Sequence, residues 1–141
     1  MTAALATATA ATFVWLGMVL AISFLEAPLK FRAPGVTIPI GLGIGRLVFR
    51  ALNSAEVVLA VAGVIGVTAG APSTGVVAAG AVAVAALVVQ LVVVRPPLNR
   101  RSDSILAGEN APRSRVHYAY IALEAIKVVA LFAAGIALLA Q

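Results

Sequence analysis

The sequence predicts an all-α polytopic membrane protein, with residues 1–141 forming a single domain built as a bundle of four transmembrane helices. Hydrophobic residues make up 62% of the chain and charged residues 11%, whereas soluble domains average roughly 45–50% and 25%. Charged residues are absent from 1–25, 57–94 and 128–141. An apolar run of about 18 residues or more can cross a hydrocarbon core of about 30 Å as a helix.

Four spans are expected in order along the chain, near residues 5–27, 45–69, 74–94 and 115–139. The first lacks the basic leader of a signal peptide and has a longer apolar run, so we expect it to be retained. The uncharged run 57–94 is too long for one span. It contains the turn-forming sequence Gly-Ala-Pro-Ser-Thr-Gly at 70–75, which separates the second span from the third. The fourth span follows the last arginines.

The basic residues predict the orientation. Nine of the ten cations flank the first and third connections, and the second connection has none. Because basic residues collect on the cytoplasmic side, we expect a multi-pass plasma-membrane protein whose basic connections are cytoplasmic and whose termini are both outside. The net charge of +5 is therefore a topology signal. Nucleic-acid binding requires a basic face on a soluble domain, and no such domain is predicted.

Several classes of site and contact can be judged from residue counts and spacing. The chain has no cysteine and one histidine, which excludes disulfides, thiolate ligands and a multi-histidine metal site within one chain. We predict no metal site. Gly66 and Gly70, and likewise Ala81 and Ala85, have the small-xxx-small spacing of closely packed membrane helices. These pairs fit either packing within the bundle or a homo-oligomer contact.

Polar residues follow stripes along the predicted helices. On the second span they recur at i, i+4, i+7 and i+10, the repeat of one helix face. The fourth span has a comparable stripe that starts at Arg113, and the third contributes one glutamine just inside Arg95. The stripes give the candidate pocket residues, which are Arg46, Arg50, Asn53, Glu56, Gln90, His117, Tyr120, Glu124 and Lys127.

The cost of charge in lipid predicts that these residues face the bundle interior. A lone charge at the bilayer centre costs from about 2.5 to more than 10 kcal/mol. Glu124 and Lys127, at i and i+3, can pair within one helix, and Glu56 can add a second carboxylate or lie beside Arg50 and Asn53. Two carboxylates around one ammonium leave an excess negative charge, which a proton, a cation or Arg50 can neutralise. A polar clasp that fixes helix register and a cytoplasm-facing pocket for a small solute or ion both fit this pattern.

The first family resemblance rests on Trp15-Leu16-Gly17, Phe24, Ala27-Pro28 and Phe31, followed by Gly45-Arg46-Leu47-Val48-Phe49. This pattern resembles the small four-helix membrane family that includes the human cisplatin-resistance-associated transmembrane protein. His117 matches the histidine of that family's last helix, with Tyr120 and Glu124 in place of a serine and an asparagine. The resemblance implies a membrane protein of poorly defined activity with a transport association.

The second resemblance is to the membrane-associated eicosanoid and glutathione transferases, which are four-helix trimers. Their second helix carries an "R..RA..N..E" signature. Arg46, Asn53 and Glu56 keep that spacing, while Arg50 and Ala51 fall one residue late. The resemblance implies glutathione binding from the cytoplasmic side through Arg50, Asn53 and Glu56, with glutathione as the cofactor.

These observations give three functional hypotheses. The preferred one is a protein, expected to be homo-oligomeric in the lipid bilayer, that binds or transports a small solute or ion and needs no cofactor. A glutathione-transferase-like membrane enzyme is the first alternative. A structural or accessory subunit of a membrane complex is the second, and it predicts a closed polar clasp with no pocket.

Overall fold

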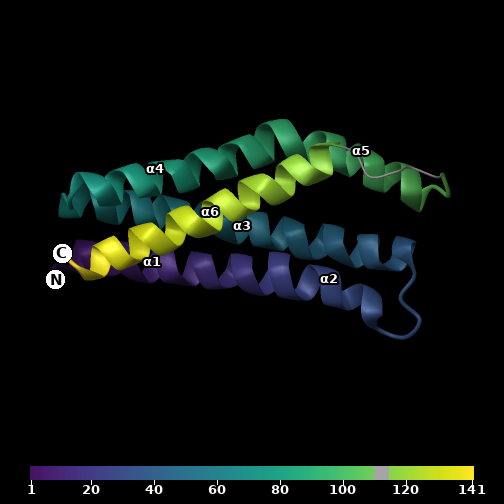
Figure 1. Ribbon diagram of the computed structural model, residues 1–141, viewed down its shortest axis with the longest axis horizontal. Coiled ribbons are helices and arrows are strands. Elements are labelled where there is room, and N and C mark those ends of the chain that lie inside the picture. The colour runs from purple at the N-terminus through teal and green to yellow at the C-terminus, as the bar shows by residue number, and fades with distance from the viewer. Residues whose placement is uncertain (110–114) are drawn as a thin grey trace.

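Four long helical segments make up the computed structural model, which describes residues 1–109 and 115–141 (Figure 1). The segments are long and apolar enough to cross a membrane, and they run over Ala3–Arg32, Ile38–Gly70, Thr74–Leu106 and Arg115–Leu139. The described residues contain no strand. The predicted all-α bundle of four membrane-spanning helices is confirmed.

Each long segment consists of one or more helical elements. The first contains α1 (Ala3–Val19), the π-helical η1 (Leu20–Glu26), α2 (Ala27–Leu29) and the 3₁₀ turn η2 (Lys30–Arg32). The second is α3 (Ile38–Gly70). The third contains α4 (Thr74–Val89), the π-helical η3 (Gln90–Val94) and α5 (Arg95–Leu106), and the fourth is α6 (Arg115–Leu139).

Three helical segments extend beyond the predicted spans at the end that carries the basic residues, and the first of them continues to Arg32. The second helix starts at Ile38, because the Thr37 hydroxyl caps it by accepting from Ile40 N at 3.3 Å and Pro39 lies in its first turn. The third continues past residue 94 to Leu106 in spite of two prolines at 96 and 97. The extension 38–44 was missed because proline and two glycines make it a weak helix former by sequence, and the extension 95–106 because it is polar and contains two prolines.

Each π-helical segment ends two residues before a proline, Pro28 after η1 and Pro96 after η3. The N–H of Ala27 bonds to Ile22 O, and the N–H of Arg95 bonds to Gln90 O, each five residues back. Proline has no N–H to donate to the preceding turn. The wider turn lets the helix continue past it and rotates the side chains that follow. Ser23 lies within η1 and Gln90 begins η3, and the side chains of both bond to Glu124 in the bundle interior.

The helices pack in the order α3, α1, α6 and α4, since α1 contacts both α3 and α6 extensively, α4 packs on α6, and α3 and α4 touch little. The chain termini lie at one end of the bundle, and η2 and α5 lie at the opposite end (Figure 1). We call the latter the basic end. The central apolar core consists of Trp15, Leu16, Val19, Ala60, Ala83, Leu87, Ala130 and Leu131.

Glycines permit the close approach of α1 to its neighbours. A Cβ on Gly66 would lie 2.7 Å from Ala4 O, and one on Gly135 would lie 2.7 Å from the Phe13 ring. Gly66 therefore packs within the chain, as one of the two sequence readings proposed. Ala81 and Ala85 are instead exposed on α4. Large apolar side chains are also exposed along all the spans, as expected for a surface in contact with lipid.

Candidate functional site

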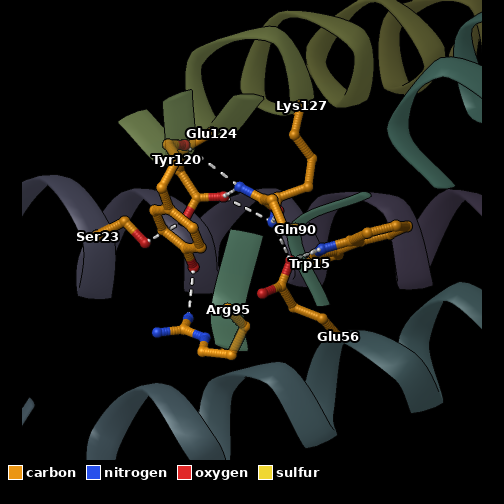
Figure 2. Close-up of polar contacts among 8 residues, drawn as sticks. All are labelled: Trp15, Ser23, Glu56, Gln90, Arg95, Tyr120, Glu124 and Lys127. Carbon is orange, nitrogen blue, oxygen red and sulfur yellow. Dashed lines mark hydrogen bonds and ion pairs between the residues drawn. The ribbon is translucent and has the colours of Figure 1, made fainter. Parts of the chain in front are cut away.

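A buried polar cluster lies in the middle of the bundle and takes side chains from all four spans (Figure 2). Five of its members are buried, and the sixth, a serine, is partly buried. We call it the buried cluster, and it consists of Trp15, Ser23, Glu56, Gln90, Glu124 and Lys127.

Lys127 of α6 is the centre of the cluster and is 0% exposed. Its Nζ lies 2.5 Å from Oε2 of Glu56, 2.6 Å from Oε1 of Glu124 and 2.7 Å from Oε1 of Gln90. An ammonium has three N–H donors, so these contacts use all of them. The ion pair between Glu124 and Lys127 that the i, i+3 spacing predicts is present.

The two carboxyl groups differ in the hydrogen bonds that their oxygens accept. Glu124 accepts from Lys127 and from Gln90 Nε2 (3.1 Å) at Oε1, and from the Ser23 hydroxyl (2.6 Å) at Oε2. Glu56 accepts from Lys127 and from Trp15 Nε1 (2.7 Å) at Oε2. Oε1 of Glu56 is buried and has no hydrogen-bond partner. Glu56 is therefore the carboxyl with the weaker set of donors.

The cluster fixes how the helices are rotated against one another. Removing one partner from a buried ion pair costs about 3–5 kcal/mol, because the other charge is left uncompensated. A rotation of α3 or α6 that moved Glu56 or Lys127 toward lipid would carry that cost. This arrangement meets the expectation of a polar clasp, but it does not exclude a pocket beside it.

A pocket of this kind extends from the buried cluster toward the basic end. We call it the basic cavity, and it has a volume of about 460 Å³. Ser23, Tyr120 and Glu124 line it, so it shares two residues with the buried cluster. Its other polar or aromatic lining residues are Phe24, Lys30, Phe31, Arg46, Phe49, Arg95, Asn99, Arg101, Ser102 and His117.

Arg95 forms one wall of the basic cavity. Its guanidinium donates to the Tyr120 hydroxyl at 3.0 Å and lies 4.8 Å from the Tyr120 ring centroid and 5.4 Å from that of Phe49. Its Nε is buried without a partner. No ion pair joins it to a carboxylate in the described residues. Lys30, by contrast, pairs with Glu26 at 3.7 Å.

A second, more open hollow lies between α3 and the η3–α5 segment. We call it the outer groove, with a volume of about 640 Å³. Arg50 and Asn53 line it together with Arg46 and Arg95. Arg46 and Arg95 also line the basic cavity, so the two hollows share a wall. Arg46 NH1 contacts Asp103 Oδ1 in an exposed ion pair between α3 and α5.

The structure thus divides the predicted site. Glu56, Gln90, Glu124 and Lys127 come together in the buried cluster, while Tyr120 and His117 line the basic cavity. The expectation that Arg50 is buried beside Glu56 is wrong, because Arg50 is exposed in the outer groove. Six residues of α-helix turn by about 600°, which puts these two side chains about 120° apart. Arg113, at the start of the predicted stripe, lies outside the described residues.

The sequence prediction missed Trp15, Ser23 and Arg95. Trp15 and Ser23 are eight residues apart in the first span, and each has a hydrogen-bond donor in an apolar stretch that follows the last threonine. These donors were the available signal, since buried indole and hydroxyl groups usually find a partner. Arg95 was assigned only to topology, because a cation at a helix end commonly serves that role.

Comparisons with models of protein families, with curated proteins and with solved structures give no match to this chain. The geometry and chemistry of the site itself therefore carry the information about function. Among the described residues, no group of three or more His, Cys, Asp or Glu side chains is placed to hold a metal ion.

Proposed function

We propose that this membrane protein binds a small amphipathic anion in the basic cavity and carries it across the bilayer. The main support for this proposal is the environment of the Arg95 guanidinium. Arg95 is a cation in the cavity wall that no carboxylate neutralises in the described residues, and its Nε is buried without a partner. A carboxylate, sulfonate or phosphate ligand would supply the missing acceptor, because guanidinium binds such groups with charge-assisted hydrogen bonds.

The remaining lining of the cavity favours an anion with an apolar body. Four of the side chains around it are cationic and one is anionic. Lys30 and Arg46 are paired with carboxylates outside the lining, whereas the positive charge of Arg95 is not balanced by an ion pair in the described residues. Phe31, Phe49 and Ile121 provide apolar surface in the same space. A volume of about 460 Å³ lies in the range of roughly 300–1,000 Å³ that small-molecule sites occupy. Inorganic ions alone would leave the aromatic surface unused.

The proposed orientation follows from the charge distribution. With the basic connections in the cytoplasm, the cavity would open to the cytoplasm and the buried cluster would close its inner end. A carrier must also open toward the other side. The sparse contact between α3 and α4 marks the helix pair whose separation would change most easily. We also propose that the protein is a homo-oligomer, with exposed small residues of α4 such as Ala81 and Ala85 available for a contact between copies.

Binding can be tested with p-toluenesulfonate as the probe and the protein in nanodiscs of phosphatidylcholine, so that the lipid itself carries no net charge. A ligand at 100 times its Kd stabilises a protein by about 2.7 kcal/mol, which raises the unfolding temperature measurably. We expect stabilisation by p-toluenesulfonate, little by neutral p-toluenesulfonamide and little by sulfate. Equal effects of the sulfonate and the sulfonamide would overturn the anion assignment.

The residue assignment has a matched control. Arg95→Gln should abolish the stabilisation, whereas Arg100→Gln should leave it intact, because Arg100 is exposed and does not line the cavity. Arg95→Lys keeps the charge and should retain part of the binding, so a general folding defect can be recognised. Uptake of labelled p-toluenesulfonate into proteoliposomes then tests transport. Binding without uptake would refute the carrier proposal and leave a binding protein.

The glutathione-transferase alternative has a separate requirement. It needs Arg50, Asn53 and Glu56 to act on one ligand, yet Arg50 and Asn53 line the outer groove while Glu56 is bonded within the buried cluster. Adding glutathione to the same stability assay tests this alternative, with Arg50→Ala as the variant. The accessory-subunit alternative predicts that none of these small molecules stabilises the protein.

A further inference from the structure

The buried cluster contains an unbalanced charge. It has one cation, Lys127, and two carboxyl groups, Glu56 and Glu124, with exposures of 0%, 0% and 1%. Its other members are neutral. Lys127 is the only ion-pair partner of either carboxyl in the described residues. With all groups ionised, the cluster would hold one net negative charge in the membrane interior, which is strongly unfavourable.

Arg50, one of the groups that the sequence offered as compensation, does not reach the cluster. It is exposed in the outer groove. Arg95 is closer, but its guanidinium bonds to the Tyr120 hydroxyl rather than to a carboxylate. The cluster must therefore be neutralised by something it binds.

The hydrogen bonds identify the carboxyl that takes up the charge. Glu124 has donors at both oxygens, whereas Glu56 has donors at Oε2 alone, and its Oε1 is buried without a partner. An ionised carboxylate with one unsolvated oxygen is much less stable in an apolar interior than a neutral acid in the same place. Glu56 is thus the better proton acceptor.

We propose that the buried cluster is a proton-binding site, in which the carboxyl of Glu56 holds one proton and Glu124 and Ser23 connect it to the basic cavity. Ser23 and Glu124 belong to the cluster and also line the cavity. This inference does not depend on which solute the cavity binds.

The transfer balances at each step. Ser23 passes its hydroxyl hydrogen to the Glu124 carboxylate and takes a proton from a hydronium ion in the cavity, which leaves water. Lys127 then gives one proton to Oε2 of Glu56. The Glu124 carboxyl turns so that the proton on its Oε2 faces Lys127 Nζ, which takes it. Lys127 ends as an ammonium, Glu124 as a carboxylate and Glu56 as the acid. The short contacts of Lys127 to both carboxyls, 2.5 and 2.6 Å, fit such an exchange.

The groups around Glu56 determine how this site responds to pH. From α6, Lys127 and Glu124 face it, and Tyr120 lies beyond Glu124 at the cavity, where it meets Arg95 of α5. From α1 and η3 it meets the neutral side chains of Trp15 and Gln90 through the cluster. Lys30 of η2 lies at the level of Gly45 and Phe49, two turns or more toward the basic end. The uptake of a proton with falling pH should therefore be a property of Glu56, Glu124 and Lys127 together, and not of Glu56 alone.

Infrared spectroscopy of the purified full-length protein in nanodiscs tests the proposal without any ligand. A protonated carboxyl has a C=O stretching band that a carboxylate lacks. We expect this band in the wild-type protein at neutral pH, with an intensity of one carboxyl per chain. Its absence would overturn the proposal. A band that is absent in sodium or potassium buffer but appears in the buffer of a large organic cation would assign the site to a metal cation instead.

The charge balance makes a distinctive prediction for variants. Glu56→Gln should lose the band, and Glu124→Gln should lose it too, because the remaining carboxylate and Lys127 then neutralise each other. Lys127→Met should increase the band about twofold, since both carboxyls then need a proton. Glu109→Gln is the matched control at an exposed carboxyl and should change nothing. Persistence of the band in Glu56→Gln and Glu124→Gln alike would refute the site.

The rate of hydrogen–deuterium exchange tests whether the proton reaches the buried cluster through Ser23. In D₂O the C=O band shifts as the proton is replaced by deuterium, and the rate of this shift reports access to the site. Ser23→Ala should slow the shift several-fold without removing the band, whereas Ser102→Ala, another serine of the cavity lining, should not. Equal rates in both variants would overturn the connection through Ser23.

Discussion

Replacing Lys127 with methionine should be the most damaging single substitution in the buried cluster. Lys127 is 0% exposed, and its ammonium satisfies Glu56, Glu124 and Gln90 at 2.5–2.7 Å. Methionine keeps most of the side-chain volume, so packing is largely retained and the electrostatic loss dominates. Removal of one partner from a buried pair gives an expected loss of about 3–5 kcal/mol.

The second half of this prediction is a double-mutant cycle with Glu124→Gln. In the wild-type background that change removes a carboxylate with donors on both oxygens. In the Lys127→Met background it removes a carboxyl that has already lost its ammonium partner, so it should cost much less or even stabilise the protein. Interaction energies of about 0.5–3 kcal/mol are typical of coupled groups, and this pair should lie near the upper end because Nζ and Oε1 are 2.6 Å apart.

Reversible unfolding of the purified protein, followed by circular dichroism in mixed detergents, measures the four free energies of the cycle. Arg100→Met is the control for loss of a long cationic side chain at an exposed position, with an expected change of about 0–1 kcal/mol. Additivity of the two changes to within about 0.5 kcal/mol would refute the idea that Lys127 and Glu124 form one electrostatic unit.

Three further outcomes follow from the fold. Gly66→Ala should destabilise the bundle by about 1–3 kcal/mol, because the added Cβ would lie 2.7 Å from Ala4 O. Gly63→Ala should be neutral or stabilising, because a Cβ there would have nothing within 4 Å. Equal thermal stability of the two variants would contradict the close packing of α1 on α3. Arg50→Ala should lower stability no more than Arg100→Ala, since both arginines are exposed; a much larger loss at Arg50 in the same unfolding assay would restore the buried position that the sequence suggested. A single cysteine at Ser102 should be shielded from impermeant thiol reagents in intact cells and one at Ser73 should be labelled; the reverse pattern would overturn the cytoplasmic assignment of the basic end.

The buried cluster and the basic cavity are two parts of one polar region. Glu124 and Ser23 belong to both, so a charge that enters the cavity is felt by the cluster across a single side chain. Coupling between two binding sites is reciprocal. An anion bound beside Arg95 and a proton bound at Glu56 would therefore favour each other, and the two proposals remain separately testable because the infrared measurement needs no anion.

The sequence by itself determined the membrane class, the number of spans and the approximate place of each. These follow from composition and from the length of apolar helix needed to cross a bilayer, which depend on no contact between helices. It also identified which polar residues could not face lipid. Glu56, Gln90, Glu124 and Lys127 were recognised on that basis, because the cost of an unpaired polar or charged group in hydrocarbon is large enough to predict burial before any partner is known.

Only the tertiary structure decided which of these side chains meet. Helical periodicity gives the angle between residues of one helix, but the rotation of that helix in the bundle depends on its neighbours. Close packing at Gly66 and Gly135 and the wider π turns at η1 and η3 set those rotations. They turn Glu56 inward and leave Arg50 exposed in the outer groove. They also bring the indole of Trp15 to Glu56 and the hydroxyl of Ser23 to Glu124, which are 41 and 101 residues away in sequence. No local sequence pattern encodes these contacts, because the packing of the helices determines which side chains meet.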